Sequence, residues 1–199
     1  MNENNARQGD KKEQTLQAAI ELFATLGYEN TSIAAICTHA NVSKGLVFHH
    51  FKNKEDLLRA VFLRMAQLIN EVSVDANAKA SAAVVTPKER FIHLVEQIFT
   101  SMANAEQKRY YQLDYQIKCQ PAMREILKDL LDARYQLMMA SFEPILAMVP
   151  AADVLVDSHS LIAEIDGIAL NYLFADDTYP LAAIKARFIK KQLLLLGLA

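Results

Sequence analysis

The chain has 199 residues, a net charge of −2 and 52% apolar residues, so it can fill one or two cores and is not a disordered protein. It contains no apolar run of the roughly 18 residues that a membrane span needs, no signal-peptide pattern, and only two cysteines. A reducing cytoplasm is therefore the expected location. The near-neutral charge at first disfavours nucleic acid as a partner, because proteins that bind it are often basic.

Helical spacing of apolar residues along the chain predicts an all-α fold, since no stretch alternates strictly. The first helix presents one apolar face that ends near Leu26, where Gly27 can take the left-handed conformation that terminates a helix. Thr31 or Ser32 is expected to cap the second helix. Asn41 suits the tight turn that follows, because asparagine tolerates positive φ.

A third short helix after this turn completes a predicted helix-turn-helix. Ser43 is its expected N-cap, Val47 and Phe51 are its expected buried residues, and Asn53 is expected to cap a long fourth helix. The second helix of such a pair can enter the DNA major groove. This spacing alone is weak evidence, because helical hairpins are common and most of them bind nothing.

The exposed residues of the third helix strengthen the DNA-binding interpretation. A mid-helix Gly45 costs about 1 kcal/mol relative to alanine, which makes sense if a partner must approach the backbone closely. Lysines 44, 52 and 54 lie near helix N-termini, which attract phosphate. His49 and His50 are adjacent and point about 100° apart on a helix, so they do not form a metal pair, and no metal site is expected.

The stretch from Thr31 to Leu58, with Leu22-Phe23 and Leu26-Gly27-Tyr28 before it, resembles the TetR family of bacterial transcriptional regulators. The resemblance implies a three-helix DNA-binding domain over residues 1–56 and a larger helical domain for effector binding and dimerisation over 57–199. It implies that base edges are faced by Lys44, Gly45, Leu46 and His49. It implies that phosphates and sugars are contacted by Ser43, Phe48, His50 and Lys54, with further phosphate contacts from Thr31 and Ser32.

Three positions depart from the family pattern. Phe48 stands where many relatives have tyrosine, Asn41 replaces the usual turn glycine, and Ala34 occupies a position that is often polar or basic. These changes are expected to weaken DNA affinity or alter the operator without removing the motif. Alternatively, Leu46 and Phe48 are ordinary apolar surface residues.

The remaining chain is predicted to form further helices. One starts at Thr86-Pro87, another occupies 108–119, and a long one runs from Pro121 to a loop bounded by Pro144 and Pro150. The last two, at about 154–175 and 181–196, are apolar on several faces, which predicts a homodimer built on a four-helix bundle. The alternative is burial of these faces within one chain.

The resemblance also implies a pocket for a small apolar or aromatic effector in the larger domain. Its candidate lining residues are Phe99, Met102, Tyr111, Tyr115, Met138, Phe142 and Asp166. The apolar members are alternatively core residues. Asp166 orients an effector or makes a hydrogen bond across the dimer interface, and the second, structural role is favoured. Effector binding is expected to favour a conformation that releases a palindromic operator.

Two other functions compete with that of a DNA-binding repressor. An enzyme is disfavoured, because the five histidines are scattered and no catalytic or cofactor motif is present. A helical dimer that binds other proteins and no DNA is the second alternative. Residues 1–60 contain seven Lys+Arg and seven Asp+Glu, so any DNA-binding surface must be local, around Lys44, Lys52 and Lys54.

Overall fold

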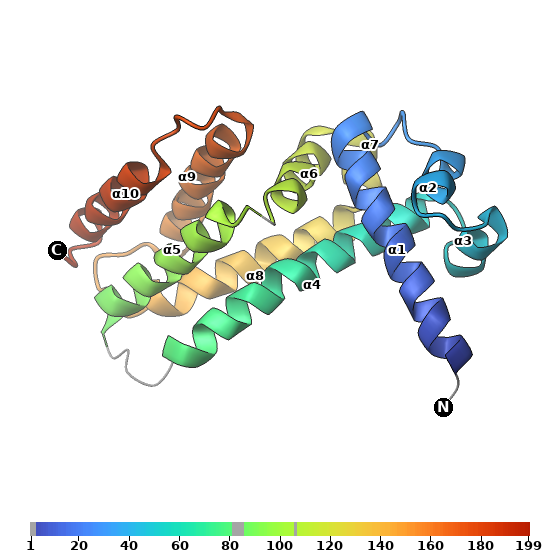
Figure 1. The fold of residues 1–199 in the computed structure, drawn as a ribbon. Helices are drawn as coiled ribbons and strands as arrows, with labels where there is room; N and C mark the ends of the chain where they lie inside the picture. The colour runs from blue at the N-terminus through green and yellow to red at the C-terminus, as the bar shows by residue number, and fades with distance from the viewer. Residues whose placement is uncertain (1–2, 81–85, 106) are drawn as a thin grey trace. The chain divides into compact units, whose positions relative to one another are not determined.

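The computed structural model describes residues 3–80, 86–105 and 107–199, which form helices and no strands (Figure 1). The predicted all-α class is confirmed. None of the helices in these ranges is both long and apolar enough to cross a membrane. The helices are α1 (Glu3–Leu26), α2 (Ile33–His39), α3 (Lys44–His50), α4 (Lys54–Ala80), α5 (Pro87–Ala103), α6 (Lys108–Cys119), α7 (Pro121–Ile126), α8 (Lys128–Leu146), α9 (Val154–Phe174) and α10 (Leu181–Leu195).

The chain divides into two compact units that are not simply its two ends. Met1–Asn70 and Arg109–Leu127 form the first unit, and Glu71–Lys108 and Lys128–Ala199 form the second. Helices α6 and α7 therefore group with the N-terminal helices, apart from the first residue of α6. The expected division into domains 1–56 and 57–199 stays a prediction about functional domains.

The ends of the first helices follow from individual residues. Gly27 has φ 84° and Asn41 has φ 51°, the left-handed conformations that the sequence predicts at these two turns. The Ser32 hydroxyl accepts a hydrogen bond from the amide of Ala35 at 3.0 Å, and the Ser43 hydroxyl accepts one from Leu46 at 3.2 Å. Two serine caps and a left-handed asparagine thus set the geometry of the α2–α3 pair.

Helix α1 carries the core of the first unit. Ala19, Ile20 and Phe23 are almost fully buried on the predicted apolar face, and the ring of Tyr28 packs edge-on against Phe23 at 5.2 Å between centroids. Helix α3 attaches through a single buried residue of its own, Val47. This leaves most of the α3 surface in solvent.

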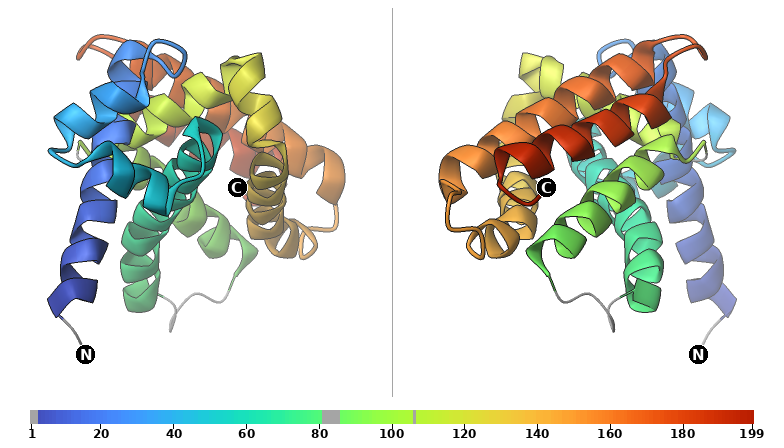
Figure 2. Two further views of the ribbon diagram at one scale, coloured as in Figure 1. Left: turned by 90° about the vertical axis from the view of Figure 1, so that its right-hand side faces the viewer. Right: turned by 90° about the vertical axis from the view of Figure 1, so that its left-hand side faces the viewer.

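The second unit has its own core, built mainly on the packing of α8 against α9 and of α5 against α8 and α10. Phe91, Phe99 and Phe142 are at most 2% exposed, and the rings of Phe99 and Phe188 lie 5.9 Å apart. Figure 2 shows α9 and α10 running alongside each other, where Glu164 accepts a hydrogen bond from Gln192 at 2.7 Å.

Two predictions for the second half of the chain are wrong. The helix that opens at Pro121 is not continuous: α7 ends at Ile126 and α8 begins at Lys128, because the buried Leu127 leaves helical geometry, with φ −109° and ψ 9°. Pro144 does not bound a loop but lies in the last turns of α8. Proline removes one amide donor there, so the Ala140 carbonyl loses its usual helical partner, and Ala140 itself is an exposed residue.

Helices α9 and α10 bury one side and leave apolar residues on another. The exposed members are Leu155, Val156, Leu170, Phe174, Leu194 and Leu195. Ala163 and Gly167 are exposed along the same side of α9, at helical spacing from Leu155 and Leu170. The isolated chain therefore does not cover this surface.

Candidate nucleic-acid interface

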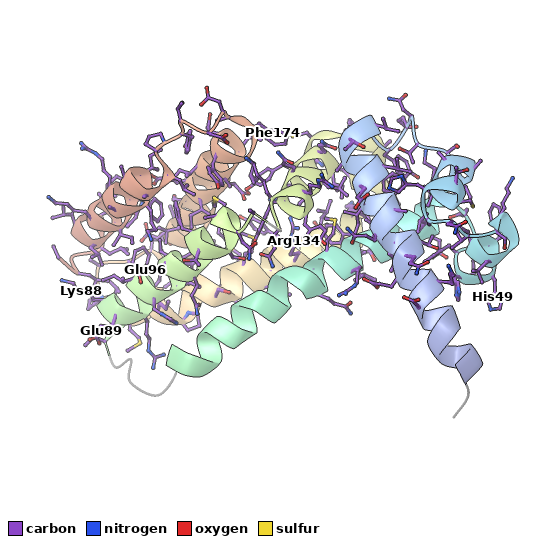
Figure 3. All side chains as sticks on the ribbon, viewed as in Figure 1. His49, Lys88, Glu89, Glu96, Arg134 and Phe174 are labelled. Carbon is purple, nitrogen blue, oxygen red and sulfur yellow. The ribbon has the colours of Figure 1, made fainter. Side chains whose placement is uncertain are left out.

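The candidate interface centres on the exposed side of α3. Lys44, Gly45, Phe48 and His49 are exposed, and Leu46 is half-buried. His49 projects from α3 in Figure 3. The Lys44 ammonium lies 5.7 Å from the centre of the Phe48 ring, which is 45% exposed. An aromatic ring, an imidazole and a cation on one short helix can contact base edges and backbone together.

Gly45 leaves open space on this surface. A methyl group built at position 45 meets no heavy atom within 4 Å. Gly45 is the second residue of α3 and not a mid-helix residue as predicted, because the helix begins only at Lys44. Its cost to helix stability is therefore smaller than the roughly 1 kcal/mol of a helix interior. The packing of this chain does not require the absence of a side chain here.

Thr31 is too buried to make the DNA phosphate contact predicted for it. Only 1% of it is exposed, and its hydroxyl donates to the carbonyls of Gly27 at 2.8 Å and Leu22 at 3.2 Å. Its neighbour Ser32 is exposed and is the N-cap of α2. Of the two hydroxyls, only that of Ser32 is accessible to a phosphate.

Lys54 is held within the domain and does not extend freely into solvent. Its ammonium lies 4.2 Å from the centre of the Tyr28 ring and donates to the Glu29 carbonyl at 3.4 Å. Burial, together with the charges of Glu55 and Glu29, raises the pKa of Tyr28 to about 12, so the phenol stays neutral. Lys54 thus ties the start of α4 to the loop after α1.

His50 points one side of its ring inward. Its Nε2 atom is buried and has no hydrogen-bond partner among the described residues. Burial, with the neighbouring charges of His49 and Lys12, lowers its pKa. A neutral imidazole with an enclosed nitrogen is a poorer phosphate ligand than the exposed His49.

The predicted interface residues do not include Lys12, which belongs to α1. Its ammonium lies 6.0 Å from the centre of the Phe51 ring, at the C-terminal end of α3. The two residues are 39 positions apart in the sequence, so sequence patterns do not reveal this proximity. The packing of α1 against α3, which only the folded chain provides, brings them together.

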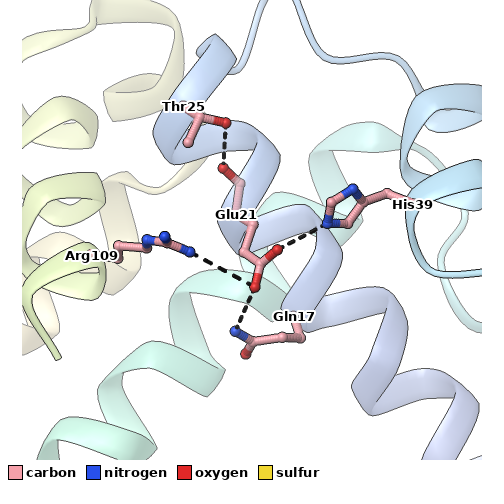
Figure 4. A network of polar contacts seen from close by, with 5 residues as sticks. All are labelled: Gln17, Glu21, Thr25, His39 and Arg109. Atoms are coloured by element: carbon pink, nitrogen blue, oxygen red, sulfur yellow. Dashed lines mark hydrogen bonds and ion pairs between the residues drawn. The ribbon is translucent and has the colours of Figure 1, made fainter. Parts of the chain in front are cut away.

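A second polar cluster of the first unit centres on Glu21 (Figure 4). Its carboxylate accepts a hydrogen bond from His39 of α2 at 2.9 Å and lies 3.9 Å from the Arg109 guanidinium of α6, while Gln17 donates to it at 3.4 Å. The His39 hydrogen bond is the main cause that lowers the pKa of Glu21. One side chain of α1 therefore joins α2 and α6.

The predicted effector-lining residues fall into both compact units. Phe99, Met102 and Phe142 are buried in the second unit, where Met138 and Asp166 are half-buried. Tyr111 and Tyr115 belong to the first unit through α6. The ring of Tyr115 is stacked under the Lys118 ammonium at 4.6 Å. Asp166 is thus not the fully buried carboxylate that its apolar helix suggests.

Comparison with known proteins identifies the helix-turn-helix. Residues 16–61, which span α2, α3 and the adjoining parts of α1 and α4, match the family model for bacterial regulatory proteins of the tetR family. The HTH-type transcriptional regulator AcrR of Shigella flexneri is 26% identical over 184 residues, 86% of this chain and 82% of AcrR. Residues 16–61 thus form a helix-turn-helix segment of the TetR-family type. The resemblance seen in the sequence is thereby confirmed.

Another curated relative matches over less than half of the chain. The fatty acid metabolism regulator protein of Bacillus subtilis (strain 168) is 33% identical over 91 residues, which cover 45% of this chain and 44% of that relative. A crystal structure of FadR from Bacillus subtilis in complex with stearoyl-CoA has a TM-score of 0.69 at 22% identity, covering 94% of this chain and 98% of that one.

A transcriptional regulator from Rhodococcus sp. Rha1 has a TM-score of 0.76 at 16% identity, covering 93% of this chain and 95% of that one. At these identities the two structures establish a shared fold over nearly the whole length. They do not transfer the ligand of either protein.

Proposed function

We propose that this protein is a sequence-specific transcriptional repressor of the TetR family that a small-molecule effector releases from its operator. The observation that carries the proposal is the exposed side of α3, where Lys44, Phe48 and His49 surround the open space at Gly45. This surface belongs to the segment that matches the family model. DNA binding of this kind takes place in the cytoplasm of a bacterial cell.

A homodimer is part of the proposal. The exposed apolar side of α9 and α10 costs free energy in water, at roughly 25 cal/mol for each Å² of apolar surface. A second copy can cover it through a twofold interface, because such an interface uses the same patch on both chains. Two α3 helices then read a pseudo-palindrome, with half-sites separated by whole turns of DNA.

The effector is proposed to be a small apolar or aromatic compound bound in the second unit. Phe99, Met102 and Phe142 there supply aromatic and sulfur-containing surface of the kind that lines ligand sites. Among proteins of similar fold, the Bacillus subtilis FadR structure contains stearoyl-CoA. Another, from Saccharomonospora viridis, contains choline. Release requires that the effector bind the DNA-free conformation more tightly than the DNA-bound one.

A mobility-shift assay with DNA from upstream of the protein's own gene tests the site. Lys44→Ala is expected to weaken binding about tenfold, since a charge-assisted contact contributes roughly 1.5 kcal/mol or more. Lys88→Ala is the matched control, because Lys88 is an exposed lysine of the second unit. Full affinity in Lys44→Ala would refute the assignment of α3 as the reading helix.

Two further outcomes separate the competing functions. A wild-type dimer that binds no duplex even at low salt would support a protein-interaction role instead of DNA binding. A monomer at micromolar concentration in sedimentation would refute the proposed dimer.

A further inference from the structure

Lys12 of α1 stands beside the end of α3. Its ammonium is 6.0 Å from the Phe51 ring, and Phe51 is the C-cap of α3. The lysine itself is exposed, although the ring beneath it is only 3% exposed. Its charge also contributes to the lowered pKa of His50, in the last turn of α3. The cation therefore sits at the surface, against the last turn of the reading helix.

Lys12 has no competing partner among the residues whose side chains are described. Its neighbours are already engaged: Lys11 donates to the Gln14 side chain at 2.9 Å, and Glu13 accepts a hydrogen bond from Arg64 at 2.8 Å. Of the other lysines after α3, Lys52 is exposed just beyond the C-cap Phe51, and Lys54 is held by Tyr28 and by the Glu29 carbonyl. Among the side chains that the structure describes, none accepts a hydrogen bond from the Lys12 ammonium.

The two ends of α3 carry cations from different helices. Lys44 is the first residue of α3, and Lys12 lies at its last turn. Seven residues at about 1.5 Å each make the helix roughly 10 Å long, while the DNA major groove is about 12 Å wide. A helix of this length that lies across the groove places its two ends close to the phosphates of the two opposite strands.

We propose that Lys12 binds a DNA phosphate, so that α1 is a DNA-contacting element in addition to α2 and α3. This inference rests on the proposed DNA binding and adds a residue outside the matched segment 16–61 to its surface. The contact carries no sequence information, because it goes to the backbone. It adds a cation from α1 at the end of α3, where the helix itself ends in His49 and His50 and exposed Lys52 follows the C-cap.

Salt dependence of binding measures such a contact directly. Each phosphate neutralised on B-DNA contributes about 0.9 to the slope of log K against log salt. Loss of Lys12 from both protomers of a dimer is expected to reduce that slope by about 1.8. Between 50 and 200 mM salt, the advantage of the wild type over the variant then shrinks by about twelvefold.

The experiment is fluorescence anisotropy of the full-length protein with two labelled duplexes, one from upstream of its gene and one of random sequence, at several salt concentrations. Lys12→Gln is expected to weaken binding to both duplexes by the same factor and to lower the slope. Lys12→Arg is expected to keep both affinity and slope, and Lys11→Gln is the matched control that changes neither. Circular dichroism melting checks that each variant is folded.

Each outcome has a distinct meaning. A slope in Lys12→Gln equal to that of the wild type would overturn the inference while leaving the proposed function intact. An equal loss in Lys11→Gln and Lys12→Gln would also overturn it, because only general charge would then matter. A folded wild type that binds neither duplex at 50 mM salt would refute the proposed function, and the Lys12 contact with it.

Discussion

Replacing Gly45 with alanine should affect stability and DNA binding in opposite directions. In the free protein the added methyl group meets nothing within 4 Å, so no strain arises. Alanine is favoured over glycine by about 1 kcal/mol inside a helix, and we take roughly half of this for the second residue of α3. Since 1 kcal/mol shifts the Tm of a chain of this size by roughly 2–4 °C, the Tm should rise by about 1–2 °C.

On DNA, the same methyl group occupies the space that the proposed function reserves for the nucleic acid. Inserting a methyl group into a packed contact costs about 1–3 kcal/mol, which corresponds to a roughly 5- to 150-fold weaker affinity for each reading helix. Melting without DNA and anisotropy with the upstream duplex measure the two effects on one preparation. Unchanged DNA affinity in a folded Gly45→Ala protein would refute the argument that the open space at Gly45 serves close approach.

Three more substitutions test other parts of the structure. Gly167→Ala should stabilise the monomer by about 1 kcal/mol, because its methyl group also meets no heavy atom within 4 Å. The same methyl group should weaken the proposed dimer at least fivefold in sedimentation, because it adds volume to the packed interface. An unchanged dimer affinity would place the interface elsewhere. Because the folded-state pKa of His50 is lowered, the unfolded chain takes up its proton first. Stability should therefore fall as the pH drops below about 6.5. Urea titrations should show a smaller loss of unfolding free energy between pH 7.5 and pH 5.5 in His50→Gln than in the wild type. An equal loss in both proteins would contradict the attribution of this pH dependence to His50. Phe142→Ala should cost about 3–5 kcal/mol in urea unfolding, since only 1% of Phe142 is exposed; a cost below about 1 kcal/mol would show that the ring borders an open cavity and not a packed core.

Local signals predicted the helices and turns well where one residue type determines the backbone. Asn41 and Gly27 adopt the positive φ expected of them. The helix predicted to start at Thr86-Pro87 does so, and Thr86 and Glu89 form a capping box in which the Thr86 hydroxyl accepts from the Glu89 amide at 3.2 Å. Such motifs satisfy their own hydrogen bonds within four residues, so no distant part of the chain is needed to specify them.

Features that depend on distant packing were not predictable in the same way. The segment around Leu127 contains no glycine, and its nearest proline is Pro121, so nothing local marks the break between α7 and α8. Thr31 and Ser32 are both suitable N-cap residues by type. Ser32 becomes the cap because the Thr31 hydroxyl instead donates hydrogen bonds to the carbonyls of Leu22 and Gly27.

The candidate DNA surface shows the same limit. The family pattern named Lys54 as a phosphate contact, but its position over Tyr28 depends on a residue 26 positions earlier. Lys12 was missed because it precedes the motif and reaches α3 only through the packing of α1. Residue type therefore predicted which helix carries the candidate DNA-binding surface, while the placement of individual cations required the folded chain.

The grouping of α6 and α7 with the N-terminal helices matters for anyone who wishes to build a hybrid regulator. Gln116 donates to the Ala24 carbonyl at the end of α1 at 3.2 Å, and Arg59 of α4 donates to the Ile126 carbonyl at the end of α7 at 2.8 Å. Joining residues 1–56 to the C-terminal part of another protein would remove α6 and α7, and with them the donor that serves Ala24. Transferring the candidate DNA-binding surface together with its supporting contacts thus requires two separate stretches of sequence, Met1–Asn70 and Arg109–Leu127.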